Sequence, residues 1–207
     1  MNTPFLDWSV ASRALPGQKV SGDAHLVAPF SGGVLMAALD GLGHGPEAEA
    51  SSRVAVEEMN RSPQLAVDDQ VKNCHRALGR LRGVVMSVAS FDVPKARMTW
   101  LGVGNVEGLL VRSLNGTGVA KERLLVQGGI VGQTLPAIRP STVRITPNDV
   151  IIFATDGVEA EFLDSRLLDS IRELAPVESL ARYVLERYSK ERDDALVLVA
   201  RYLGESS

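Results

Sequence analysis

The sequence has a single cysteine, Cys74, so no disulfide can form within the chain. A lone thiol is typical of a protein kept in a reducing compartment, and we expect a cytoplasmic location. A secretory signal is also missing, because Asp7 and Arg13 interrupt the early apolar stretch. No apolar run approaches the roughly 20 residues that a membrane-spanning helix requires. These absences exclude a disulfide-stabilised fold and predict no attachment to a membrane.

The sequence also has no excess of positive charge. Lysine and arginine number 22 against 25 acidic residues, the net charge is −3, and no basic stripe is present. Nucleic-acid binding depends on such a stripe, so this class of function is disfavoured. Aromatic residues make up only 5%, but the hydrophobic content of 45% and charged content of 23% are ordinary for a folded protein. We expect a single domain over residues 1–207, long enough for a substantial core.

Apolar periodicity predicts the order of strands and helices. The predicted strands are residues 5–14, 24–30, 33–40, 84–91, 98–103, 107–112, 142–145, 150–154 and 195–200. The predicted helices are residues 46–61, 68–81, 165–173 and 176–190. Short turns join the first three strands, which we expect to form an antiparallel meander. The glycine-rich stretch 115–140 has too weak a pattern to predict an element.

This order is not the regular alternation of strand and helix that produces a parallel sheet. Strands come in runs, interrupted by two pairs of helices. Such a pattern is typical of an α+β fold, with helices on the outside of antiparallel sheets. Cys74 lies on the apolar stripe of the helix at 68–81 and is expected to be a core thiol.

Acidic residues occupy the ends of four predicted strands. Asp40 and Asp156 follow apolar strands, while Asp23 and the pair Asp193-Asp194 precede strands. Strand ends are rigid, and several of them can meet at one rim of a sheet. Carboxylates gathered there repel one another unless cations lie between them. Mg²⁺ and Mn²⁺ prefer such oxygen ligands, so the pattern indicates a divalent metal site.

Each of these acidic positions also has a purely structural interpretation. Asp-Gly after a strand is a common turn, which fits Asp40 and Asp156 equally well. Asp23 could cap a turn, and Asp193-Asp194 could be a solvated strand start. The joint occurrence of the four positions is what favours a metal site over four independent turns.

The segment Asp40-Gly41-Leu42-Gly43-His44-Gly45 connects a strand to a helix. Its glycines permit positive φ and let a ligand approach the backbone closely. Pro46 then suits the first helical turn. His44 could donate a proton to a leaving group, or it could order water or pack within the loop.

Four segments occur in the order found in the PPM (PP2C-like) metal-dependent protein phosphatases. They are residues 21–23, 40–45, 155–158 and 193–199. The sequence resembles the bacterial branch that includes the SpoIIE and RsbU phosphatases more than the eukaryotic branch. Within that branch it looks most like the compact stand-alone phosphatases of the stressosome. The resemblance extends over residues 8–202.

The resemblance implies a PP2C-like four-layer α-β-β-α sandwich, with two central antiparallel sheets flanked by helices. It implies a protein serine/threonine phosphatase that uses two Mn²⁺ or Mg²⁺ ions. The implied substrates are phosphorylated stressosome scaffold proteins, so that the enzyme resets a bacterial stress signal. The alternatives are a phosphatase that acts on a small molecule or on an anti-sigma factor antagonist, and a non-catalytic binding module that keeps the fold.

The resemblance also implies a set of metal ligands. Asp40 would bridge the two ions, and the Gly41 carbonyl would be a further ligand. Asp156 and Asp193 would complete the ligand shell of one ion. Within the pair Asp193-Asp194, Asp194 is the other candidate for this ligand. Asp23 would hold the second ion directly or through water.

Two further residues have implied catalytic roles. Arg13 lies on the first strand, where some family members carry a phosphate-binding arginine; its alternative is a solvent-facing strand residue. His44 is the candidate acid. The loop departs from the eukaryotic branch, because Leu42-Gly43 intervene before His44. Gly22 also stands where that branch has an additional acid, which implies either looser binding of the second ion or its ligation through water.

Overall fold

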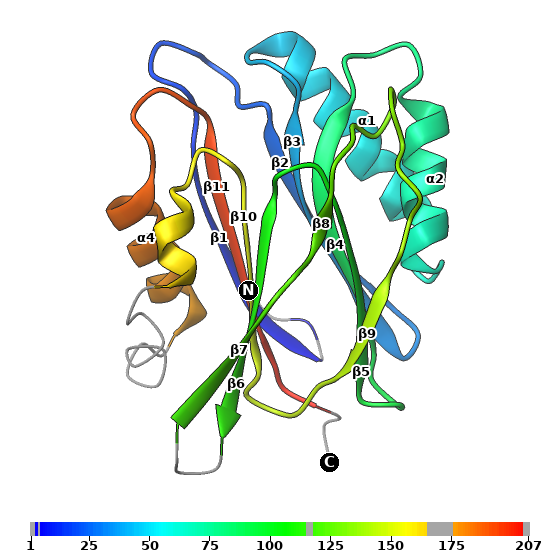
Figure 1. Ribbon diagram of the computed structural model, residues 1–207, viewed down its shortest axis with the longest axis vertical. Helices are drawn as coiled ribbons and strands as arrows, with labels where there is room; N and C mark the ends of the chain where they lie inside the picture. The colour runs from blue at the N-terminus through cyan, green and yellow to red at the C-terminus, as the bar shows by residue number, and fades with distance from the viewer. Residues whose placement is uncertain (1–2, 4, 115–117, 165–175, 205–207) are drawn as a thin grey trace.

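Two β-sheets stack face to face in the computed structural model, which describes residues 3, 5–114, 118–164 and 176–204 (Figure 1). The first sheet has the order β1 (Leu6–Arg13), β11 (Ala195–Tyr202), β10 (Val150–Ala154), β6 (Glu107–Leu114) and β7 (Gly118–Arg123). The second has the order β2 (Asp23–Phe30), β3 (Gly33–Gly41), β4 (Val84–Asp92), β5 (Arg97–Val103) and β8 (Val126–Gln127). A further strand, β9 (Ser141–Arg144), also pairs with β5.

Helices cover the outer face of each sheet (Figure 1). The helices α1 (Pro46–Arg61) and α2 (Val67–Ala77) pack on the second sheet. The helix α4 (Val177–Tyr188) and the short 3₁₀ helix η1 (Ala160–Leu163) pack on the first. Within the described ranges, no helix is both long and apolar enough to cross a membrane. The predicted four-layer α-β-β-α arrangement is confirmed.

Strand β10 shows why the central strands are continuously apolar. Ile151 and Phe153 point into the layer between the two sheets, whereas Ile152 and Ala154 point toward α4. Both faces of the strand are therefore buried, and an alternating pattern would place polar groups in an apolar layer. Helix α2 instead buries a single apolar stripe, which includes Cys74, and exposes its opposite face. The Cys74 side chain is fully buried, which confirms the predicted core role, and this burial raises the pKa of the thiol to about 12.

Strand pairing corrects the expected meander. Strand β1 does not pair with β2; it pairs with β11 in the other sheet, placing Arg13 opposite Ala195. The connection after β1 crosses from one sheet to the other, and periodicity alone does not specify a strand's partner. The meander instead runs through β2, β3, β4 and β5.

Other differences concern the weakly patterned regions. Strands β7 and β8 lie in the stretch 115–140, where no element was predicted. Strand β8 pairs with β5 in parallel, so the second sheet is not wholly antiparallel. Helix α2 ends at Ala77, four residues before the predicted end at 81. The predicted helix at 165–173 lies outside the described residues.

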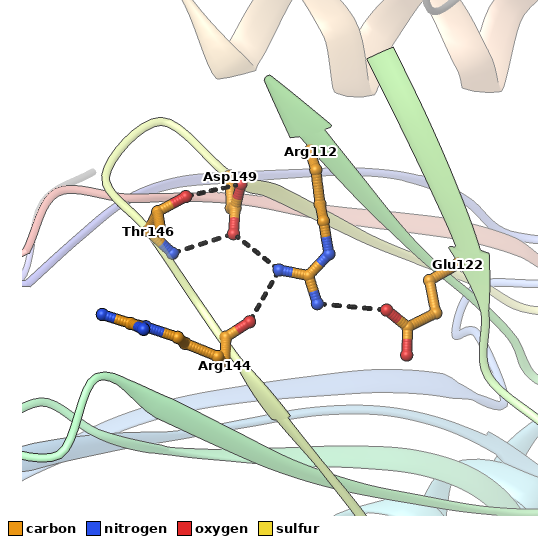
Figure 2. Close-up of polar contacts among 5 residues, drawn as sticks. All are labelled: Arg112, Glu122, Arg144, Thr146 and Asp149. Atoms are coloured by element: carbon orange, nitrogen blue, oxygen red, sulfur yellow. Dashed lines mark hydrogen bonds and ion pairs between the residues drawn. The ribbon is translucent and has the colours of Figure 1, made fainter. Parts of the chain in front are cut away.

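A polar cluster ties the two sheets together where the chain passes from β9 to β10 (Figure 2). The Arg112 Nη1 donates to the Arg144 carbonyl at 2.6 Å and lies 3.4 Å from the Asp149 carboxylate. Its Nη2 donates to Glu122 at 3.1 Å. Buried Asp149 also accepts from the Thr146 backbone N–H at 2.9 Å. These contacts anchor the start of β10, whose opposite end leads to Asp156.

Candidate active site

Carboxylates from both sheets meet at one rim of the sandwich, where β3 and β10 end and β11 begins (top of Figure 1). Asp40 and Asp23 lie opposite each other on the antiparallel pair β3 and β2. Asp156 follows β10, and Asp193 precedes its antiparallel neighbour β11. Asp40, Asp156 and Asp193 line one cavity of about 610 Å³. The cavity is also lined by His44, Asn105 and Arg192.

The carboxylates at this rim are held close enough to repel one another. Burial, followed by repulsion from Asp40, raises the pKa of Asp23 to about 8. Burial, followed by repulsion from Asp156 and Asp193, raises the pKa of Asp40 to about 7. The pKa of Asp193 is also raised, by burial and then by Asp156. The site therefore favours protons or cations that reduce its negative charge.

Hydrogen bonds orient two of these carboxylates. The Thr155 hydroxyl donates to Asp23 Oδ2 at 2.7 Å and accepts from the Leu196 backbone N–H at 2.9 Å. Asp23 is thereby linked across the sandwich to the pair β10 and β11. The Asn105 amide donates to Asp156 Oδ2 at 2.8 Å. Each carboxylate keeps oxygen lone pairs for a further ligand.

The adjacent residues Asp193 and Asp194 have different environments. Asp194 is only 3% exposed. Its two oxygens accept from the backbone N–H groups of Leu15 and Gly22, each at 2.7 Å. Asp193 instead lines the cavity. The geometry therefore favours Asp193 as a ligand and Asp194 as the anchor of the segment that leads into Asp23.

Three predicted site residues occupy different environments. His44 is exposed and lines the cavity beside Asp40. Gly41 is packed so tightly that an added Cβ would lie 2.2 Å from the Ala48 carbonyl oxygen. Arg13 does not line the cavity, and its Nη2 donates to the Lys190 carbonyl. The catalytic roles of Arg13 and His44 and the ligand role of Gly41 stay predictions.

The donor set fits hard divalent ions that keep part of their water shell. Three carboxylates line the cavity, and burial and repulsion between neighbouring carboxylates raise the pKa of two of them, Asp40 and Asp193. In the part of the chain that the structure describes, no three Asp, Glu, His or Cys side chains converge on one ion position. Mg²⁺ is usually bound through one or two carboxylates and several waters, so this arrangement suits it.

Sequence reasoning missed two of the polar residues at this site. Asn105 follows Gly104 in a turn, and nothing in the sequence distinguishes it from an ordinary turn residue. Arg192 stands immediately before Asp193, and that adjacency is the only sequence signal for it. Both lie at the cavity because the β5–β6 turn and the segment before β11 reach the same rim.

The raised pKa values predict that the metal-free protein loses stability as pH rises from about 4 to about 8. The unfolded chain ionises Asp23 near the ordinary aspartate pKa of 3.8, whereas the folded chain holds that proton up to about pH 8. The folded state therefore binds more protons in this window, and the unfolding free energy falls with rising pH. His25, whose pKa burial lowers, acts in the opposite direction.

The comparison that isolates this effect is wild type against Asp23→Asn, which retains His25. Urea unfolding in EDTA should show wild type losing stability relative to the variant between about pH 5 and about pH 8. Adding MnCl₂ should raise the wild-type melting temperature more at the upper end of this range, where fewer protons must be displaced. Parallel pH profiles for the two proteins would contradict the prediction.

Comparison with known families gives a match over most of the chain. The family model described as Stage II sporulation protein E (SpoIIE) matches residues 31–203. A relative, the phosphoserine phosphatase RsbX of Bacillus subtilis (strain 168), is 24% identical over 191 residues. That alignment covers 92% of this chain and 90% of the relative.

Solved structures show the same fold. A chain from work described as "The bacterial stressosome: a modular system that has been adapted to control secondary messenger signaling" has a TM-score of 0.81 at 28% identity. The match covers 95% of this chain and 99% of that chain. RsbX in complex with magnesium has a TM-score of 0.83 at 20% identity, and the match covers 98% of each chain.

Proposed function

This chain belongs to the SpoIIE family of PP2C-like phosphatase domains, and from that premise we propose that it is a metal-dependent protein serine/threonine phosphatase. The observation that carries the proposal is the meeting of Asp40 from one sheet with Asp156 and Asp193 from the other at one cavity. Family membership supplies the reaction class, and the carboxylate rim supplies the metal-binding chemistry that the reaction needs. The proposed cofactors are two ions of Mn²⁺ or Mg²⁺.

Each residue at the rim has a distinct proposed role. Asp40, Asp156 and Asp193 would hold the ions, with Asp23 acting directly or through water. When bound, such ions lower the pKa of a coordinated water and neutralise charge on the phosphoryl group. Asn105 keeps the Asp156 carboxylate oriented. His44, which is exposed and lines the cavity, is the proposed proton donor to the departing serine oxygen.

A covalent phosphocysteine route does not fit this chain. Thiol nucleophiles react as thiolates and therefore need a depressed pKa. Burial instead raises the pKa of Cys74 to about 12. The thiol also lies between helices α1 and α2, where it donates to the Ala55 carbonyl. Direct attack by water is thus the chemistry that the proposal assigns.

The proposed substrates are phosphoserine or phosphothreonine residues of stressosome-type scaffold proteins. The relative named phosphoserine phosphatase RsbX supports phosphoserine. The 28% identical chain from a stressosome study supports the scaffold. The alternative substrate is a phosphorylated anti-sigma factor antagonist, and the alternative function is a non-catalytic binding module. A cytoplasmic location belongs to the same proposal.

The test uses purified full-length protein and two phosphorylated substrates, a stressosome scaffold protein and an anti-sigma factor antagonist. Mass spectrometry follows phosphate loss with MnCl₂, with MgCl₂ and with EDTA. We expect metal-dependent loss from the scaffold protein that stops in EDTA. Phosphate loss from the antagonist alone would identify the antagonist, rather than the scaffold protein, as the substrate. Phosphatase activity that survives chelation would overturn the metal mechanism. Metal binding without any hydrolysis would identify a binding module.

A further inference from the structure

Arg192 is the one lysine or arginine among the described residues that line the carboxylate cavity. Its side chain is exposed, and it forms no hydrogen bond or ion pair with any residue in the described ranges. It also stands directly before Asp193, which lines the same cavity. This guanidinium, unpaired among the described residues, therefore extends from the same turn as a proposed metal ligand.

Hydrogen bonds fix this turn at both of its ends, Lys190 and Asp194. On one side, the Lys190 backbone N–H donates to the Gly157 carbonyl at 2.7 Å, and the Lys190 carbonyl accepts from Arg13 Nη2. On the other side, the Asp194 carboxylate accepts from Leu15 and Gly22. Arg192 and Asp193 therefore extend from a short segment whose position is set by contacts to β1 and to the loop after β10.

The other basic side chains near the site are engaged elsewhere. The Arg13 guanidinium binds the Lys190 carbonyl and does not line the cavity. The Lys190 ammonium donates to the Asp156 carbonyl at 2.6 Å. Arg82 forms an ion pair with Glu47 beside the glycine loop. Of these groups, Arg192 is the one that combines access to the cavity with unused donors.

The chemistry of a guanidinium suits a phosphoryl group. Its planar array of N–H donors matches two phosphate oxygens and forms charge-assisted hydrogen bonds. We propose that Arg192 binds the phosphoryl oxygens of the substrate, and that Arg13 is a positioning residue that holds the turn carrying Arg192 and Asp193. This inference rests on the proposed phosphatase function. It assigns phosphate recognition to the turn before β11 and gives β1 a supporting role.

The first experiment compares wild type with Arg192→Ala, Arg192→Lys and the matched control Arg187→Ala, which removes an exposed arginine from α4. Calorimetry measures the Kd of inorganic phosphate for Mn²⁺-saturated protein, and kinetics measure KM and kcat for a phosphoserine peptide. We expect Arg192→Ala to raise both Kd and KM about tenfold, as for loss of one charge-assisted hydrogen bond. The Kd and KM of Arg192→Lys should lie between those of wild type and Arg192→Ala, because lysine keeps the positive charge but lacks the planar pair of N–H donors. Arg187→Ala should match wild type.

The second experiment examines Arg13→Ala and Arg13→Lys. A positioning role predicts weaker Mn²⁺ binding in Arg13→Ala, because the turn that carries Asp193 loses the hydrogen bond from Arg13 to the Lys190 carbonyl. It predicts recovery in Arg13→Lys, whose ammonium can still donate to the Lys190 carbonyl. At saturating Mn²⁺, where the bound ion itself holds Asp193 and the turn, the Kd of phosphate should change less in either Arg13 variant than in Arg192→Ala.

The outcomes separate this inference from the proposed function. An Arg192→Ala protein with the wild-type Kd for phosphate overturns the inference, and so does a larger Kd change in Arg13→Ala than in Arg192→Ala. Mn²⁺-saturated wild type that fails to bind phosphate also overturns it. A wild type that binds phosphate but hydrolyses no phosphoprotein overturns the proposed function alone, because calorimetry reports on Arg192 without turnover.

Discussion

Asp40→Asn should lower kcat for a phosphoserine substrate by about a thousandfold or more, a rise of roughly 4 kcal/mol in the activation free energy. Asp40 is the proposed ligand that the second sheet contributes to the cavity, facing Asp156 and Asp193 of the first. Asparagine keeps the volume of the side chain and removes its charge. The measurement is phosphate release in saturating MnCl₂, together with the Kd of Mn²⁺ by calorimetry.

The same substitution should stabilise the protein when metal is absent. Burial and repulsion raise the pKa of Asp40 to about 7, so above that pH its ionised form is unfavourable in the folded state. Asparagine removes that penalty, and the melting temperature in EDTA should rise. The increase in melting temperature that MnCl₂ produces in wild type should be largely lost.

The matched control for this prediction is Asp69→Asn on α2, an exposed carboxylate far from the cavity that pairs with Lys72. It removes the same charge and should leave kcat and Mn²⁺ binding unchanged. Wild-type turnover in Asp40→Asn would contradict the metal mechanism. A lower melting temperature for Asp40→Asn in EDTA would contradict the electrostatic account of the rim.

Gly157→Ala should be among the most damaging single substitutions in this chain. A Cβ at this position would lie 1.8 Å from the Asp194 carbonyl oxygen, and backbone cannot rotate away as a side chain can. Relief requires the loop after β10 to separate from the segment before β11. That movement would pull Asp156 away from Asp193, because these residues flank the point of contact.

We expect a loss of about 3 kcal/mol in stability from this overpacking, which for a chain of this size lowers the melting temperature by roughly 6–12 °C. Misplacing a ligand by about 1 Å should also reduce kcat by about a hundredfold. Gly128→Ala is the control, since an added Cβ there meets no atom within 4 Å. A Gly157→Ala protein with the wild-type melting temperature would contradict this prediction. It would show that the loop after β10 and the segment before β11 can separate at no cost in stability.

The strand-end acids were predictable from the sequence because their placement is local. Asp40 and Asp156 each terminate an apolar run, and the strand at 195–200 follows Asp193-Asp194 directly. A rigid element with a carboxylate at its end is recognisable without knowledge of the partner strand. The resemblance to the PP2C-like phosphatases rests on these same positions, and it extends them to an implied ligand set.

Residues whose role depends on distant partners were not predictable in this way. Asp193 and Asp194 are equivalent in sequence, yet Asp194 is fixed by Leu15 and Gly22, which lie 179 and 172 residues away. Asn105 belongs to the site because folding brings its turn within hydrogen-bond distance of Asp156, and the sequence around Asn105 does not indicate this contact. Arg13 occupies the expected strand, but the pairing of β1 with β11 directs its guanidinium to the Lys190 carbonyl.

Local patterns along the chain are enough to specify the α+β class, most strand and helix positions, and the four acidic strand ends. Each of these follows from the spacing of apolar residues over a few turns or strand repeats. Long-range contacts in the folded protein place β1 in the other sheet and bring Asp193, but not Asp194, to the cavity. They also leave Arg192 as the unpaired cation among the described residues there. Those outcomes depend on which backbone donors and which sheet edges meet across the sandwich, and local periodicity carries no information about such pairings.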